Sequence, residues 1–114
     1  MSNIKKEKRI RLKKKIRAKI FGTEARPRLS VFRSNKFIYA QIINDDKGIT
    51  VVNSSDVKDA KGTKGERAVR VGKDIATKAK EMKINTVVFD RNGFRYTGRV
   101  KMLADEARKN GLEF

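Results

Sequence analysis

The stretch LSVFRSNKFIYAQII, residues 29–43, decides the fold, because apolar side chains recur at every second position in both of its halves. A period of two is typical of β-strands that bury one face. The polar pair Ser34 and Asn35 separates the halves and predicts a turn between antiparallel strands. The sequence therefore predicts a β-hairpin. Its predicted buried face consists of Leu29, Val31, Ile38, Ala40 and Ile42.

The opposite face of this hairpin is unusually rich in aromatic side chains. It consists of Ser30, Phe32, Phe37, Tyr39 and Gln41. Aromatic rings on an exposed sheet can stack on the bases of RNA. Alternatively, a second layer such as the N-terminal segment covers this face and makes it part of the core, and for Phe32 and Phe37 the sequence favours neither interpretation. We expect Tyr39, whose hydroxyl is polar, and Gln41 to contact RNA.

The rest of the chain predicts an α/β fold with a mixed sheet and the element order β-β-β-α-β-α after a basic N-terminal segment. A third strand is expected over residues 49–53, and a fourth, short and apolar, over residues 86–89. The helix between them should connect two parallel strands through a right-handed crossover. Residues 54–65 are polar and predict a loop.

Two helices are predicted to cover the sheet. Thr63 and Glu66 have the spacing of a capping box, which satisfies free backbone donors at a helix start. The helix that follows should reach about Met82, and its inward face should consist of Ala68, Gly72, Ile75, Ala76, Ala79 and Met82. Gly111 is placed to end the last helix. The inward face of that helix should consist of Val100, Leu103, Ala104 and Ala107.

The composition indicates a polyanionic partner. The chain has 30 Lys and Arg residues and 13 Asp and Glu residues, so its formal net charge is +17. In the free protein these positive charges repel one another. Nucleic acid is the commonest such partner, because neutralising phosphates releases counterions. An anionic membrane surface is the alternative, but no apolar run is long enough to span a bilayer. We therefore expect a cytoplasmic protein.

The absence of two residue types narrows the chemistry. The chain has no Cys and no His, which excludes disulfides, thiolate metal sites and a histidine general base. The candidates for a two-metal nuclease are Asp45, Asp46, Asp56, Asp59 and Asp90. Most of them lie in predicted loops without the convergent spacing that such a site requires. We expect no enzymatic activity and no cofactor.

The basic residues are concentrated at the N-terminus. Residues 1–28 carry 12 of the 30 basic residues and two of the acidic ones. We expect residues 1–25 to form an arm, disordered in isolation because its charges repel and helical against RNA phosphates. Residues 26–114 should form the globular domain. The predicted phosphate contacts are Lys6, Arg9, Arg11, Lys13, Lys14, Lys15, Arg17 and Lys19 in the arm, with Arg26 and Arg28 beside Pro27. A merely solubilising tail is the alternative.

Two further segments are candidate RNA contacts. The predicted turn places cations beside hydrogen-bonding side chains, the alternative being a plain surface turn; it consists of Arg33, Ser34, Asn35 and Lys36. A second cluster lies where the last helix begins, and free backbone N–H groups at a helix start favour phosphate. That cluster consists of Arg91, Arg95, Tyr96 and Arg99. A solvated turn is the alternative there, and Asp90 is expected to pair with one of these arginines.

Several segments of the body carry a resemblance to a known family. They are RPRLSVFRSNK over residues 26–36, IYAQ over 38–41, VVFDR over 87–91, GRVK over 98–101 and GLEF over 111–114. Together they resemble the bacterial large-subunit ribosomal protein L18 family. The resemblance covers residues 26–114 and is weaker over 53–64. Asn92, Phe94 and Thr97 stand where the family has Gly, Tyr and His.

This resemblance implies binding to 5S rRNA and contact with 23S rRNA and neighbouring large-subunit proteins, as a monomer within the cytoplasmic ribosome. It also implies a fold similar to the ribonuclease-H-like group, without its catalysis. Two other functions stay open. An RNA chaperone would show no preference for 5S RNA over an RNA of equal length. A peptide carrier at membrane surfaces would bind anionic vesicles better than RNA.

Overall fold

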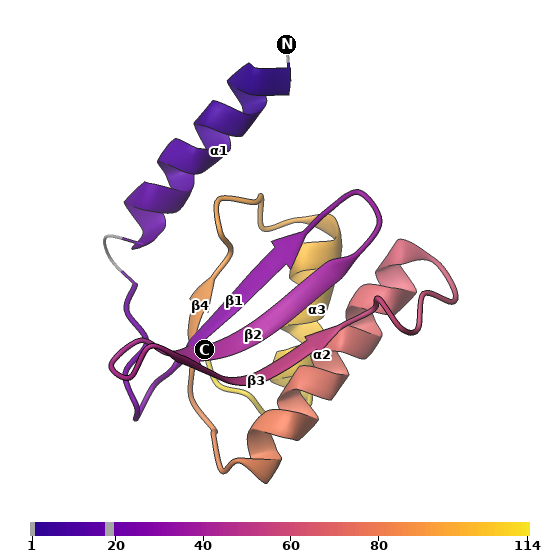
Figure 1. Ribbon diagram of the computed structural model, residues 1–114. Helices are drawn as coiled ribbons and strands as arrows, with labels where there is room; N and C mark the ends of the chain where they lie inside the picture. The colour runs from indigo at the N-terminus through magenta and orange to yellow at the C-terminus, as the bar shows by residue number, and fades with distance from the viewer. Residues whose placement is uncertain (1, 18–19) are drawn as a thin grey trace.

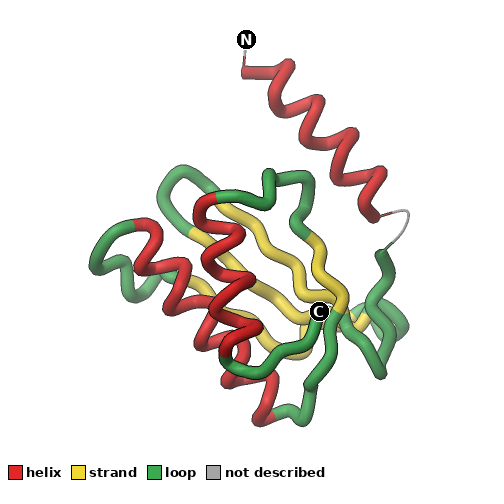
Figure 2. The backbone as a smooth tube through the Cα atoms, turned by 180° about the vertical axis from the view of Figure 1, so that it is seen from behind, coloured by secondary structure: helices red, strands yellow, loops and turns green. Residues whose placement is uncertain are grey.

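The computed structural model describes residues 2–17 and 20–114, and for residues 2–5, 16 and 17 it describes the backbone alone. In chain order the elements are α1 (Ser2–Arg17), β1 (Arg28–Arg33), β2 (Ile38–Asn44), β3 (Ile49–Ser55), α2 (Lys64–Glu81), β4 (Val88–Asp90) and α3 (Gly98–Lys109). Helices α2 and α3 lie side by side on one face of the sheet (Figure 1 and Figure 2). Helix α1 projects from the side of the sheet on which β4 lies. The predicted α/β class is confirmed.

The sheet is mixed, with the strand order β3-β2-β1-β4. β2 is antiparallel to both of its neighbours, and Phe32 of β1 lies opposite Tyr39 of β2. β1 and β4 are parallel, with Arg28 opposite Val88. β3 and β4 therefore run in the same direction, as predicted for the strands that flank α2. They lie at opposite edges of the sheet, because β2 and β1 are inserted between them.

The core lies between the sheet and the two helices α2 and α3. The predicted buried face of the hairpin is confirmed, and its members are each 0% exposed: Leu29, Val31, Ile38, Ala40 and Ile42. The predicted inward face of α3 is equally buried. Gly72 lets the helices approach closely, since a Cβ there would lie 2.4 Å from the Leu103 carbonyl oxygen. The division into a covered and an open face follows from the alternation in the hairpin.

The ends of several elements differ from the prediction. Met82 is 54% exposed, so its inward placement was wrong. The cause is that α2 ends at Glu81 and the left-handed φ of 60° at Lys83 turns the chain away. The start of α2 is as predicted, since the Glu66 N–H donates to the Thr63 Oγ1 at 3.1 Å. The fourth strand begins later than predicted, at Val88, because its pairing with β1 starts there.

A buried arginine joins three separate segments of the chain. Arg28, at the start of β1, is 9% exposed. Its Nε and Nη2 each donate to Asp45 at 3.0 Å, and its Nη1 donates to Asp90 at 2.9 Å. The hydrogen bond with Asp45 raises the pKa of Arg28, although burial opposes this. The expected pairing of Asp90 with an arginine of the following loop was therefore wrong, because the parallel register brings Arg28 beside the end of β4.

Helix α1 rests against the turn that follows β4. A Cβ on Gly93, whose φ is +78°, would lie 2.5 Å from the Arg9 carbonyl oxygen, so this approach depends on glycine. The Arg9 guanidinium lies 4.9 Å from the centre of the Phe94 ring, within the range of a cation–π interaction. Ile10 of α1 is 41% exposed. A close backbone contact and one cation–π pair therefore place α1 on the body.

We expect Asp90→Ala to lower the free energy of unfolding by about 3 kcal/mol, because it removes one partner of a buried guanidinium. Glu24→Ala, which removes an exposed ion pair with Lys47, should cost less than about 1 kcal/mol. Urea unfolding of the two variants measures the difference. Equal costs would contradict the structural role given to Asp90.

Gly93→Ala should release α1 from the body. Alanine at a left-handed φ costs roughly 1 kcal/mol, and the new methyl group would also meet the backbone of Arg9. Gly48→Ala is the matched control, since Gly48 has a φ of +64° and nothing lies within 4 Å of a Cβ placed there. Both variants should unfold slightly earlier, but only Gly93→Ala should speed tryptic cleavage within residues 5–17. The same cleavage rate in both would show that Gly93 does not hold α1.

Candidate nucleic-acid interface

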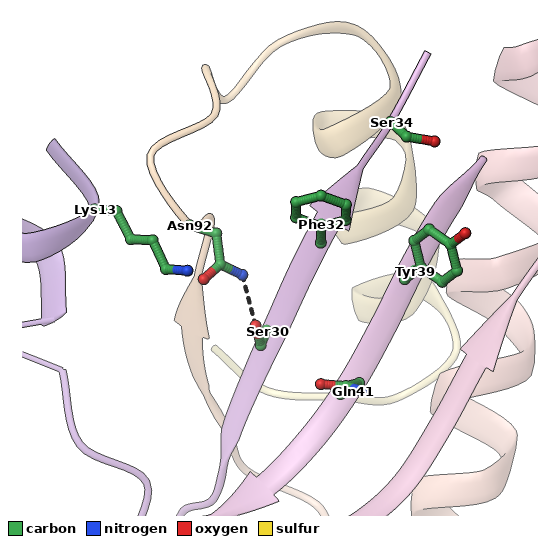
Figure 3. Close-up of a pocket in the computed structure, with 7 residues that line it drawn as sticks. All are labelled: Lys13, Ser30, Phe32, Ser34, Tyr39, Gln41 and Asn92. Carbon is green, nitrogen blue, oxygen red and sulfur yellow. Dashed lines mark hydrogen bonds between the residues drawn. The ribbon is translucent and has the colours of Figure 1, made fainter. Parts of the chain in front are cut away.

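The open face of the sheet carries a groove of about 450 Å³. β1 and β2 form its floor, and α1 lies along one side (Figure 3). The residues that line it are Lys13, Ser30, Phe32, Ser34, Tyr39, Gln41 and Asn92. Predicted RNA contacts from the arm, the turn and β2 are thus brought together, namely Lys13, Ser34, Tyr39 and Gln41.

The aromatic floor of the groove remains open to solvent. Phe32 is 45% exposed, so the arm does not bury it. Its ring centre lies 6.0 Å from that of Tyr39 and 5.4 Å, edge-on, from that of Phe94. For Phe32 the structure therefore favours an exposed surface over the core. Phe37 lies outside the groove, half-buried just before β2.

The Asn92 side chain is held in one orientation. Its Nδ2 donates to the Ser30 Oγ at 2.6 Å and to the Val31 carbonyl oxygen at 2.9 Å. Its backbone N–H donates to Asp90 Oδ1 at 2.9 Å. Because the amide nitrogen is used by these two contacts, the group that Asn92 can offer to a ligand is the acceptor Oδ1. In Figure 3 this oxygen lies on the side of Lys13.

Two arginines hold the β1–β2 turn from the helix side. Arg99 donates to the Ser34 carbonyl oxygen and Arg67 to the Lys36 carbonyl oxygen, each at 3.0 Å. Burial lowers the pKa of Arg99, and the nearby charge of Arg33 lowers it further. Arg99, a predicted RNA contact, therefore binds the backbone of the turn.

The outer side of the same turn is exposed. Asn35 and Lys36 are exposed, and Arg33 and Ser34 are half-buried. The Arg33 guanidinium lies 5.2 Å from the centre of the Phe94 ring. The turn is thus a fixed backbone that presents polar and cationic side chains outward.

The predicted cluster after β4 is not a single site. Tyr96 packs edge-on against Phe89, with ring centres 5.6 Å apart, and its hydroxyl accepts a hydrogen bond from Arg108 at 2.8 Å. Arg91 donates to the Phe94 carbonyl oxygen at 3.1 Å. Arg95 is exposed, whereas Arg99 faces the β1–β2 turn. These four residues therefore have separate environments.

Most described cations of the arm are exposed to solvent. Arg9 is half-buried against Phe94, and Lys19 and the side chain of Arg17 lie outside the described residues. The exposed predicted contacts are Lys6, Arg11, Lys13, Lys14, Lys15 and, at the junction, Arg26. Arg28 differs from them because two carboxylates enclose it. Arg28 therefore has a structural role, and its contact with RNA stays a prediction.

Four residues of the interface were not among the predicted contacts. Ser30 and Phe32 were assigned to the open face by the period of two, which is the signal that identifies them. Nothing in the sequence indicated that Arg67 holds the turn, because an arginine within a helix is ordinarily exposed. Asn92 was noted only for its departure from the family pattern. Its role depends on contacts with Ser30 and Val31, 62 and 61 residues away in sequence.

The carboxylates considered for a two-metal nuclease form no metal-binding group in the described part of the chain. No group of three or more His, Cys, Asp or Glu side chains there could hold a metal ion. Asp45 and Asp90 pair with Arg28, and Asp56 pairs with Arg67 at 3.3 Å. Among the described helices, none combines the length and the apolar character needed to cross a membrane.

Known proteins similar to this chain fall in one family. Residues 3–114 match the family model described as ribosomal L18 of archaea, bacteria, mitochondria and chloroplast. The large ribosomal subunit protein uL18 of Porphyromonas gingivalis is 53% identical over 111 residues, covering 96% of this chain and 97% of the relative. That of Bacteroides thetaiotaomicron is 55% identical over 109 residues, covering 95% and 96%. That of Lactobacillus acidophilus is 54% identical over 114 residues, covering 96% and 95%.

The match includes most of the arm as well as the body, so it extends beyond the segments on which the resemblance first rested. Identity of about half over nearly the full length of both chains leaves no large region without a counterpart. The chain therefore belongs to the ribosomal L18 family.

Proposed function

We propose that this chain is a structural, non-enzymatic constituent of the large ribosomal subunit, where it binds 5S rRNA and helps to attach it to 23S rRNA. The relatives reported above are named large ribosomal subunit proteins. The observation that carries the proposal is the groove on the open face, where contacts from the arm, the turn and β2 meet beside exposed cations. A surface of this kind offers phosphate and base contacts together.

The arm and the body have different tasks in this proposal. The exposed cations of α1 neutralise phosphates, which supplies affinity without reading sequence. The body supplies the register, because the β1–β2 turn and the groove are held rigidly by Arg67, Arg99 and the Arg28 network. RNA is recognised chiefly through its shape and its unpaired bases, and a rigid surface suits both.

The contact set follows from exposure and from existing partners. In the body we propose contacts by Arg26, Arg33, Ser34, Asn35, Lys36, Tyr39, Gln41, Arg91 and Arg95. Arg28, Tyr96 and Arg99 are left out, because their polar groups already bind other segments of the protein, whereas those of Ser34 and Arg91 bind only within their own turns. In the arm we propose phosphate contacts by the predicted residues, Arg17 and Lys19 included.

The same proposal includes the organisation of the chain. Residues 1–25 act as an RNA-binding arm and residues 26–114 as the globular domain. The protein is a monomer within the ribosome, beside neighbouring large-subunit proteins. Its α/β body resembles the ribonuclease-H-like group in fold without sharing its chemistry.

A salt titration tests the division between arm and body. The full chain should prefer 5S rRNA over an RNA of equal length. Deleting residues 1–25 should flatten the slope of log K against log salt by roughly four to six units, since about five to seven phosphate contacts are lost. The preference for 5S rRNA should persist in the deleted chain. A slope change below about one unit would contradict the role of the arm, and equal binding of both RNAs by the full chain would favour a general RNA chaperone.

The two tyrosines of the chain provide a matched pair of variants. Tyr39→Phe should weaken binding of 5S rRNA about two- to tenfold, the value of one hydrogen bond. Its melting temperature should stay unchanged, because the Tyr39 hydroxyl has no hydrogen-bond partner among the described residues. Tyr96→Phe removes a hydroxyl that binds Arg108 and should leave RNA binding intact. Weaker folding with intact binding in Tyr39→Phe would place Tyr39 in the core instead.

A further inference from the structure

The groove contains polar groups that the protein itself does not use. Within the described part of the chain, neither the Lys13 ammonium nor the Gln41 side-chain amide forms a hydrogen bond or an ion pair, and the Asn92 Oδ1 accepts no hydrogen bond. These groups line the same groove as the exposed ring of Phe32. The groove therefore has a flat apolar surface for stacking and unused donors and acceptors at its rim.

This combination matches the chemistry of one unpaired nucleobase. A base that leaves its stack needs a ring to replace its neighbours and polar groups for its hydrogen-bonding edge. The volume of about 450 Å³ falls within the range of pockets that hold small ligands. An apolar side chain from a neighbouring protein would use the ring but leave the surrounding amides and the lysine without partners.

We propose that this groove captures a single nucleobase turned out of the RNA. The inference rests on the proposed function and adds a specific ligand to it. The base lies against Phe32 and Tyr39, with a donor of its edge, an amino group or a ring N–H, facing the Asn92 Oδ1. The ammonium of Lys13 pairs with the adjoining phosphate. Gln41 can donate or accept, and so it serves the remaining atoms of the edge.

The fixed orientation of Asn92 gives the site its selectivity. Because Ser30 and the Val31 carbonyl hold the amide nitrogen, the amide cannot rotate to offer a donor without losing both bonds. An acceptor alone faces the base. The site therefore selects a base that presents a donor there, and a base whose edge presents only acceptors is disfavoured.

The groove is complete only when α1 is docked. Lys13 belongs to α1, and a Cβ on Gly93 would lie 3.2 Å from its backbone nitrogen. The contact that holds the arm therefore also positions the lysine beside Asn92. Docking of α1 therefore favours capture of the base, and capture of the base favours docking of α1.

A combined RNA and protein scan tests this inference with the full chain. Each unpaired nucleotide of 5S rRNA is replaced in turn by an abasic residue, and binding is measured for the wild type and for Phe32→Leu. One abasic position should weaken binding by the wild type about fivefold to a hundredfold, the effect of losing one stacked base. The same position should have little further effect in Phe32→Leu, because that variant has already lost the stacking ring. Phe32→Leu keeps an apolar side chain, and its melting temperature verifies folding.

The matched control is Phe21→Leu, which changes a phenylalanine that is 56% exposed and lies outside the groove. It should show the full abasic penalty of the wild type. At the sensitive position, removing only the amino group or ring N–H of the base should weaken binding by the wild type as well.

The outcomes separate this inference from the proposed function. Normal, salt-dependent binding of 5S rRNA, with abasic penalties that simply add to that of Phe32→Leu at every position, would overturn base capture and leave the proposed function standing. The same holds if no abasic position matters, which would favour a protein side chain as the occupant. If the wild type does not prefer 5S rRNA at all, the proposed function itself fails.

Discussion

A positive charge buried between two carboxylates determines where the interface can form. Arg28 ties the start of β1 to Asp45 after β2 and to Asp90 at the end of β4. A buried guanidinium is tolerated only when its donors are satisfied, so the ends of these strands must meet. Asp90 then accepts the backbone N–H of Asn92, which places the Asn92 amide over β1. The groove therefore depends on a network of buried charges that lies outside its lining.

The two faces of the sheet serve opposite purposes. On the covered face, Gly72 lets α2 and α3 pack closely, and the apolar half of the hairpin is fully buried. On the open face the same strands carry Phe32 and Tyr39, whose rings give the body little stability while they remain in water. Such a face is useful when a partner supplies the missing layer. In this protein α1 borders the open face without covering it.

Much of the fold follows from local patterns, and much of the interface does not. The hairpin, the cap at Thr63 and the inward face of α3 each depend on residues close in sequence, so periodicity and spacing predict them. The roles of Arg28, Arg67 and Arg99 depend on partners that lie 17 to 65 residues away. A count of cations cannot separate those that bind carboxylates and carbonyl oxygens from those that remain exposed to solvent. Partners distant in the sequence also explain why an RNA contact was predicted for Tyr96 and none for Asn92.

The positively charged residues fall into two groups that occupy different places in the structure. The arginines that face inward act through directed hydrogen bonds, three from Arg28 and one each from Arg67 and Arg99, which suits the planar guanidinium group. The described cations of α1 are mostly lysines without such partners, exposed to solvent and able to follow the irregular path of phosphates. This separation supports the proposed division, in which the arm supplies affinity that depends on salt and the body supplies position. Gly93 joins the two, because it lets the helix that carries the charge lie against the turn that carries Asn92.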